Sequence, residues 1–235
     1  NVILNFSDDE KKTYIERLVK TKNLISNSPS KQKYGEILKG LLYLRQSCLW
    51  QSDMTPPSPK KYLSTKIEFL LEQLEQILEE GHQALVFSQF TTYLDLIQSI
   101  LREKHWKLSR IDGSMNVNKR QAEVDQFQSG KTQVFLISLK AGGLGLNLTA
   151  ASYVFLMDPW WNPAVENQAI DRAHRICQLN KLTVFKPIIK DSVEEKVLKL
   201  QDTKRELFKD LLPDDSDNYF SGKLSMKDFE HLLSE

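Results

Sequence analysis

Hydrophobic residues recur along this chain with two different periods, and their alternation predicts the order of the secondary-structure elements. Apolar positions three or four residues apart predict helices, and short continuous apolar runs predict buried strands. From residue 64 onward the two patterns alternate. The apolar runs predict five strands, at Ala84–Phe87, Leu108–Ile111, Val134–Ile137, Tyr153–Met157 and Val184–Ile189. Strands that alternate with helices indicate an α/β fold with a parallel sheet and right-handed crossovers.

Helical spacing predicts segments before, between and after these strands. A helix is expected from Ser64-Thr65 to Gly81, another after residue 91 to about Lys104, and a third from about Asn116 to Phe127. Residues 8–50 have two apolar stripes separated by a polar break, which predicts a helical extension. The prolines that follow it disfavour both helix and strand. The expected organisation is a helical extension, a linker, an α/β lobe and a C-terminal brace helix with its tail, at 1–51, 52–64, 65–190 and 191–235.

Four polar turns leave the ends of predicted strands. They are Ser88-Gln89, Asp112–Ser114, Ser138–Gly145 and Asp158–Asn162. In a parallel sheet the carboxyl ends of the strands share one edge, and ligands bind there. Three glycines between 142 and 145 let the backbone turn sharply and approach a ligand closely. The four turns therefore form one candidate binding edge.

A helix with an unusual polar face is predicted directly after the last of these turns. Asn162-Pro163 is a helix-start signal, with Asn as the N-cap and Pro at the first helical position. Helical phase then places Gln168, Arg172 and Arg175 on one face. Two guanidiniums one turn apart suit a polyanion such as a phosphoryl group in transfer. The alternative interpretation is a solvated basic face on an ordinary helix.

Composition restricts the function only loosely. Hydrophobic residues make up 40% and charged residues 27%, and the net charge of +1 means that polyanion binding would use local patches. Cys48 and Cys177 lie far apart, which disfavours a disulfide framework or a zinc site, so no metal ligands are predicted. No apolar run reaches transmembrane length. We expect no membrane contact and an intracellular location, in a bacterial cytoplasm or a eukaryotic nucleus. Because the chain begins without Met, we expect it to be a piece of a longer protein.

Several motifs at fixed spacing resemble one family. Residues 140–145 (KAGGLG), 152–163 (SYVFLMDPWWNP) and 168–175 (QAIDRAHR) resemble motifs V and VI of superfamily two helicases, in the form found in SWI/SNF-type DNA translocases. Residues 87–97 and 110–115 resemble earlier motifs of that group. The LRQSC phrase at 44–48 is similar to an element that precedes the second motor lobe, although a plain helix end is an equal interpretation. Residues 191–212 resemble the helix that straps this lobe. The resemblance implies a RecA-like lobe.

The resemblance also implies roles for individual residues. The two arginines would be catalytic, reaching the phosphates of ATP, with Gln168 nearby, and Gly145 and Asn147 would lie near the ribose. Trp161 would either press against a DNA groove or pack in the core. The remaining residues implied to contact DNA phosphates are Ser88, Gln89, Gly113, Ser114, Arg120, Ser138 and Lys140.

The phosphate loop GxxxxGK[ST] and an Asp-Glu magnesium box are absent from the sequence. The resemblance therefore implies half of an ATPase, in which ATP with Mg is bound mainly by the N-terminal RecA-like lobe of the same protein. The expected function is the second motor lobe of a double-stranded DNA translocase, with protein partners on DNA as a further expectation. By this reasoning the isolated chain is inactive.

Two alternatives stay open. The chain could be a non-hydrolytic docking module with the helicase-lobe fold, or the lobe of an RNA helicase. The sequence at residues 138–152 is most similar in its motifs to the post-replication repair translocases. However, no RING-type Cys/His cluster follows the prolines, and a bacterial member of the family fits as well. Cys177 occupies a position where the family usually has Gly, which would suit a left-handed helix cap.

Overall fold

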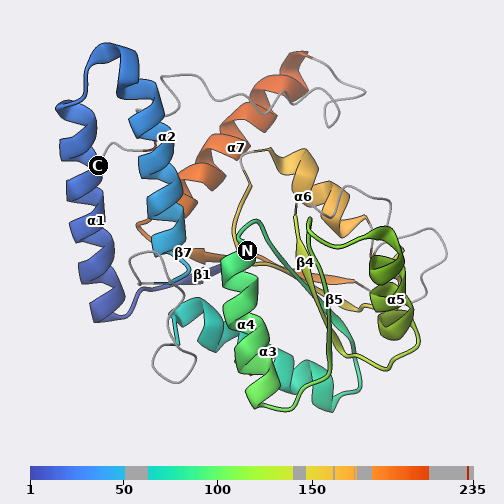
Figure 1. Cartoon of the computed structure of the whole chain (residues 1–235). Coiled ribbons are helices and arrows are strands. Elements are labelled where there is room, and N and C mark those ends of the chain that lie inside the picture. The colour runs from blue at the N-terminus through green and yellow to red at the C-terminus, as the bar shows by residue number, and fades with distance from the viewer. Residues whose placement is uncertain are drawn as a thin grey trace.

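The computed structural model describes residues 1–50, 63–139, 147–160, 162–171, 173, 182–211 and 232. Its centre is a parallel sheet with helices on both faces (Figure 1). The strand order is β3-β4-β2-β5-β6. The strands are β2 (Ala84–Ser88), β3 (Leu108–Ile111), β4 (Val134–Ser138), β5 (Tyr153–Leu156) and β6 (Thr183–Phe185). The expected α/β class, with a RecA-like parallel sheet flanked by helices, is confirmed.

The strands bury both of their sides because helices cover both faces of the sheet. Helices α3 (Thr65–Glu79) and α4 (Thr91–Glu103) cover one face, and α5 (Val117–Gln128) and α6 (Pro163–Ile170) cover the other. Alternate residues of β2 divide between the two cores: Val86 packs with α3 and α4, and Phe87 packs with α5 and α6.

Polar caps fix the starts of two of these helices. The Ser64 side chain accepts a hydrogen bond from the backbone of α3, and Asn116 does the same for α5. Gly81 follows the end of α3 with a φ of +77°, a conformation that favours glycine. These helix bounds agree with those predicted from the sequence.

The fifth predicted strand is wrong in its second half. Residues 184–189 do not form one strand, because β6 ends at Phe185 and β7 (Pro187–Ile189) belongs to a separate two-stranded sheet. Pro187 cannot donate a backbone hydrogen bond, which favours a break in the ladder at this point. The partner of β7 is β1 (Val2–Leu4), a strand that the sequence pattern did not predict. The first residues of the chain are thereby fixed to the segment that leads into the last long helix.

The helical extension is a hairpin of α1 (Asp8–Ser26) and α2 (Ser30–Ser47), which stands beside the sheet in Figure 1. A capping box between Ser7 and Glu10 starts α1, as its acidic first turn predicted. The two helices are in close contact at Gly40, where an added Cβ would lie 2.3 Å from Cγ2 of Thr21. The second helix starts seven residues earlier than the apolar stripe from Ile37 indicated.

The C-terminal helix α7 (Val193–Leu211) packs against this hairpin as well as against β7. Val193 and Val197 are buried in a third core with Tyr14 of α1, and Leu232 joins the same core. The hydroxyl of Tyr14 accepts a hydrogen bond from the backbone N–H of Val193, at 2.7 Å. The predicted strap therefore joins the N-terminal extension. No helix in the described part of the chain is long and apolar enough to cross a membrane.

Candidate functional site

The carboxyl ends of the central strands lie at one edge of the sheet, as expected. Ser88 at the end of β2 is paired in register with Ser138 at the end of β4. The Ser88 hydroxyl donates a 2.5 Å hydrogen bond to Asp158, which follows β5. The ends of β2 and β4 are thus adjacent to Asp158, the second residue after β5.

Asp158 is the buried centre of this edge. Besides Ser88, its carboxylate accepts a 2.6 Å hydrogen bond from the Gln89 side-chain amide and longer ones from the Gln89 backbone N–H. The guanidinium of Arg45 lies 3.9 Å away. Burial raises the pKa of Asp158, and Arg45 and the hydrogen-bond donors oppose that rise. Ser88 is itself buried, and its hydroxyl is engaged inside the protein.

The turn after β3 is open to solvent. Gly113 and Ser114 are exposed, and Asp112 accepts hydrogen bonds from the backbone and the hydroxyl of Ser114, at 2.9 and 2.5 Å. The Ser114 hydroxyl, together with Arg110, lowers the pKa of Asp112. Arg120 is half-buried beside this turn and donates to the Asp112 carbonyl at 3.4 Å. Its Nε is buried without a hydrogen-bond partner among the described residues.

Helix α6 starts as its sequence predicted. The Asn162 side chain accepts a hydrogen bond from the Ala164 backbone at 2.9 Å, and Pro163 occupies the first turn. Gln168 is exposed, whereas Ala169 and Ala173 are buried against the sheet. The face that holds Gln168 is therefore different from the face that packs on the lobe.

Five of the predicted site residues lie outside the described part of the chain: Lys140, Gly145, Trp161, Arg172 and Arg175. The geometry brings Ser88, Gln89 and Ser138 together and leaves the exposed Gly113-Ser114 turn and the exposed Asn147 as separate positions. The assigned roles of all these residues stay predictions.

Sequence reasoning missed the side chains that fix the turn between β5 and α6. Arg45, Lys66 and Gln201 are almost completely buried, and each donates to a backbone carbonyl of residues 157–160. A signal existed for Lys66, since this lysine directly precedes the apolar stripe of α3. Arg45 was noted only as part of the LRQSC phrase.

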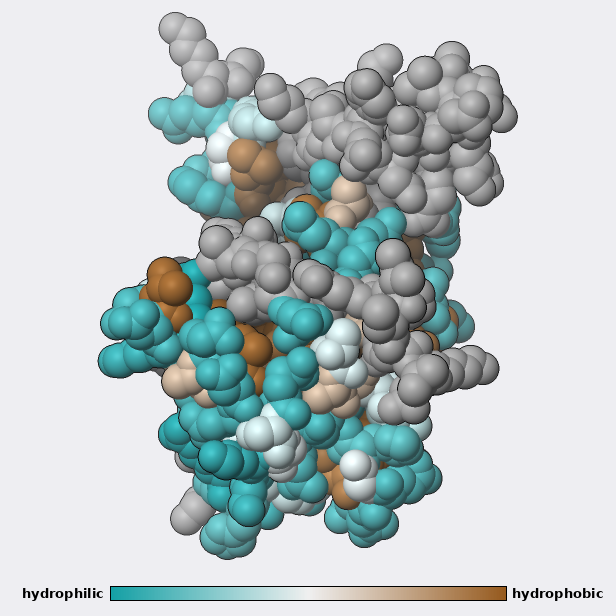
Figure 2. Space-filling view, turned by 90° about the vertical axis from the view of Figure 1, so that its right-hand side faces the viewer, coloured by the Kyte–Doolittle hydropathy of each residue, from teal (hydrophilic) through white to brown (hydrophobic). Residues whose placement is uncertain are grey.

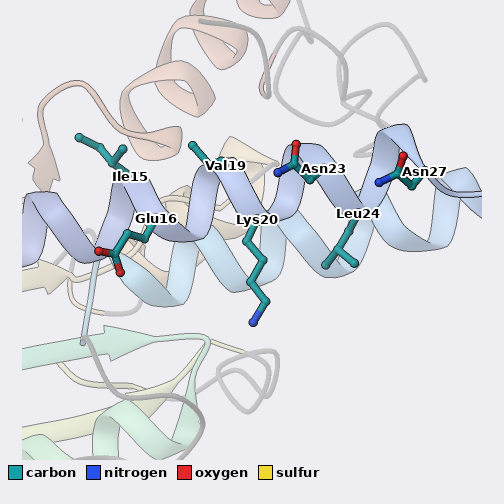
Figure 3. Close-up of a pocket in the computed structure, with 7 residues that line it drawn as sticks. All are labelled: Ile15, Glu16, Val19, Lys20, Asn23, Leu24 and Asn27. Carbon is teal, nitrogen blue, oxygen red and sulfur yellow. The ribbon is translucent and has the colours of Figure 1, made fainter.

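The described residues contain no group of three His, Cys, Asp or Glu side chains that could hold a metal ion. Two hollows in the described part of the chain lie elsewhere, on the α1–α2 hairpin. One of about 520 Å³ is lined only by residues of one face of α1 and its C-cap, including Ile15, Val19 and Leu24 (Figure 3). The side of the molecule seen in Figure 2 is mostly hydrophilic where it is described, with small separate apolar areas. The strand ends remain the best candidate site.

Comparison with known proteins bears on this edge directly. Residues 65–177, which include every turn described above, match the family described as the helicase conserved C-terminal domain. The DNA repair protein RAD5 of Candida glabrata is 45% identical over 157 residues. That match covers 63% of this chain but only 14% of the relative, so the chain spans a small part of the relative's length.

Solved structures extend the likeness to the whole chain. The Sulfolobus solfataricus SWI2/SNF2 ATPase C-terminal domain has a TM-score of 0.77 and 28% identity, and the match covers 100% of this chain and 98% of that one. The ATPase core from the same organism, solved in complex with double-stranded DNA, has a TM-score of 0.79 and 28% identity over 99% of this chain and 49% of that one. The helical hairpin and α7 thus lie within the matched fold.

Proposed function

We propose that this chain is the second motor lobe of an ATP-dependent double-stranded DNA translocase of the SWI/SNF type, because residues 65–177 match the helicase conserved C-terminal domain and the whole chain resembles a SWI2/SNF2 ATPase C-terminal domain. One observation carries the proposal. The chain aligns over almost its entire length with half of an ATPase core that was solved on double-stranded DNA. The other half would correspond to the first lobe, whose phosphate loop this sequence lacks.

The proposed nucleotide contacts come from α6 and the residues that follow it. Gln168 is exposed on this helix while Ala169 and Ala173 anchor its opposite side, which supports a polar face turned away from the core. Arg172 and Arg175 would present guanidiniums to the transferred phosphoryl group across the cleft from the first lobe. Donors at that place stabilise charge in the transition state and can contribute ~10³–10⁵ in rate. Gly145 and Asn147 would lie near the ribose.

Magnesium is assigned to the first lobe. Phosphoryl transfer needs carboxylate or hydroxyl ligands for this ion. The described residues contain no group of three His, Cys, Asp or Glu side chains that could hold a metal ion, and the sequence contains neither motif that would hold magnesium. The role proposed for this lobe is to supply positive charge and donors to the phosphates, and the first lobe would supply the metal.

DNA phosphates are proposed to bind along the turns at the strand ends. Exposed Gly113 offers a backbone donor, and Arg120 has donor capacity that the described residues leave unused. The exposed Ser114 hydroxyl would exchange its bond to Asp112 for one to a phosphate oxygen. Lys140 would add charge from the neighbouring turn, and Trp161 a contact to the groove. Contacts of this kind position the protein without reading sequence.

The same edge of the sheet also contains side chains that are buried or already bound within the protein. They are Ser88, Gln89 and Ser138. The two serines are buried, and both the Ser88 hydroxyl and the Gln89 amide are bound to Asp158. We propose that these side chains shape the turns at this edge, where DNA phosphates would bind. We also propose that the chain is divided into its four segments after residues 51, 64 and 190. An intracellular location, where DNA is found, is part of the same proposal.

The test is an ATPase assay with and without duplex DNA. A protein that contains both lobes is expected to hydrolyse ATP faster when duplex is added, and the chain of residues 1–235 is expected to hydrolyse none. Hydrolysis by the chain alone at ordinary enzyme rates would contradict the half-motor assignment. A two-lobe protein that binds partners but does not hydrolyse ATP would instead favour the docking module, and stimulation by RNA alone would favour the RNA helicase.

A further inference from the structure

The backbone between β5 and α6, residues 157–160, is bound by side chains from three helices that are distant in sequence. Each helix donates to a different carbonyl: Arg45 of α2 to Pro159, Lys66 of α3 to Met157, and Gln201 of α7 to Trp160. The Lys66 contact measures 2.6 Å. A buried backbone carbonyl needs a hydrogen-bond donor from the backbone, a side chain or water. Here long, buried side chains provide the donors, which fixes the turn to the N-terminal hairpin and to the C-terminal helix together.

The charges around segment 157–160 are balanced in pairs. Lys66 lies 2.7 Å from Glu194 of α7, Lys186 lies 2.6 Å from Glu166 of α6, and Arg45 lies 3.9 Å from Asp158. Arg45, Lys66 and Glu194 are each at most 1% exposed. Burying ionised groups is costly unless their geometry is well defined. Such a network therefore favours one arrangement of the turn over nearby alternatives.

Glu166 connects this segment to α6. One of its carboxylate oxygens accepts a 2.7 Å hydrogen bond from the Trp160 backbone N–H, and the other binds Lys186. Gln201 also reaches the first oxygen, at 3.5 Å. Helix α6 has only eight residues, and it begins three residues after Trp160. Its direction therefore depends on the position of segment 157–160.

Helix α7 is packed firmly against the α1–α2 hairpin. Its first turns are buried with α1 and α2, and its backbone at Val193 binds Tyr14. Two turns further on, the same helix presents Gln201 to Trp160 and Glu166. A shift of α7 relative to the sheet would thus be transmitted to segment 157–160 and to α6.

We propose that Arg45 and Gln201 are positioning residues that set the direction of α6, and through it the orientation of Gln168. The effect on catalysis rests on the proposed function. The effect of Arg45 and Gln201 on the direction of α6 does not depend on that function. The helical hairpin and α7 then control the nucleotide side of the lobe without contacting nucleotide.

The first test measures hydrogen exchange on the chain of residues 1–235. Gln201→Ala removes a donor without leaving a buried charge, and it is expected to speed exchange of the α6 amides about tenfold, the effect of losing one buried hydrogen bond. Amides of β2 and β4 should exchange as in the parent. The matched control is Lys199→Ala on the same helix, whose side chain is 68% exposed and pairs with Glu195. Unchanged exchange in α6, or a uniform increase over the whole chain, would overturn the proposal.

The second test places Gln201→Ala in the two-lobe protein. The expected result is a kcat at least tenfold lower with a KM for ATP within about twofold of the parent, because the aim of catalytic groups affects the transition state more than binding. An active parent whose kcat is unaffected by the substitution would overturn the positioning role. An inactive parent would count against the proposed function instead, while the exchange experiment would still decide the structural inference.

Discussion

The Lys66 ammonium of α3 lies 2.7 Å from the Glu194 carboxylate of α7, and both side chains are completely buried although 128 residues separate them. Lys66 also donates to the Met157 carbonyl, and Glu194 also accepts from the Ile189 backbone at 3.1 Å. The pair joins the first helix of the α/β lobe to the C-terminal helix. It therefore makes the two ends of the fold dependent on each other.

Removing one partner of this pair should lower the free energy of unfolding more than removing both partners does. Lys66→Met leaves a carboxylate buried without its cation, which typically costs about 3–5 kcal/mol. The double variant Lys66→Met with Glu194→Gln leaves no charge and should recover part of that loss. Urea unfolding of the parent, both single variants and the double variant measures the coupling. If the losses simply add, the two groups do not stabilise each other in the folded state.

Two glycines of α2 should respond to alanine in opposite directions. At Gly40 a Cβ would lie 2.3 Å from the buried Thr21 side chain, so Gly40→Ala should destabilise the chain by about 1–3 kcal/mol through overpacking. At Gly35 a Cβ meets nothing within 4 Å, so Gly35→Ala should stabilise the helix by up to about 1 kcal/mol. Thermal unfolding of the two variants is the measurement. Equal effects at both positions would mean that α1 and α2 do not approach closely at Gly40.

Glu195 should make part of the stability depend on acidic pH. Its carboxylate accepts a 2.9 Å hydrogen bond from the Asp191 backbone and pairs with Lys199, and the backbone bond is the main reason that its pKa is lowered. A carboxyl whose pKa is lower in the folded state stabilises the protein above its unfolded pKa of 4.5, and this contribution disappears as the pH falls through the folded value.

Glu195→Gln should therefore lower the free energy of unfolding by roughly 0.3–1 kcal/mol at neutral pH, the usual effect of a carboxylate at a helix N-terminus. The difference from the parent should vanish at more acidic pH. Lys199→Gln keeps the backbone bond and should preserve most of the pH dependence. Denaturant unfolding at a series of pH values measures both. A difference that grows on acidification would contradict the assigned contacts.

DNA binding by the chain of residues 1–235 should be weak, salt-sensitive and indifferent to sequence. Each neutralised phosphate contributes about −0.9 to the slope of log affinity against log salt. If Arg120 contacts one phosphate, Arg120→Ala should reduce the slope by that amount, and Lys12→Ala on the exposed part of α1 should leave it unchanged. Fluorescence titrations with a duplex and its scrambled sequence provide the data. Tight binding to one sequence only would contradict phosphate recognition.

The sequence predicted the elements of the α/β lobe well because their signals are local. Asn162-Pro163 started α6 where expected, Ser64 capped α3, and Gly81 followed its end. The position of the strand ends at one edge of the sheet also followed from the parallel order of the strands alone. These features depend on neighbours in sequence or on a general property of parallel sheets.

Features that depend on distant partners were not predictable from the pattern. Strand β1 has three residues, and only its pairing with β7 makes it a strand. Ser88 was expected to face a ligand, yet its hydroxyl binds Asp158, 70 residues away. Arg45, Lys66 and Gln201 each depend on a carbonyl that is distant in sequence. Helical spacing places Lys66 beside the apolar stripe of α3, but nothing nearby in the sequence shows which carbonyls these three side chains bind.

The central claim is that this lobe supplies positive charge to a phosphoryl group in transfer, and kcat of a two-lobe protein tests it most directly. Arg172→Ala or Arg175→Ala should lower kcat by at least ~10³ while duplex affinity without nucleotide and the melting temperature stay close to those of the parent. Arg→Lys should restore little activity, because an ammonium lacks the planar, forked donor set. A variant that melts normally and still hydrolyses ATP within a few-fold of the parent would contradict the claim.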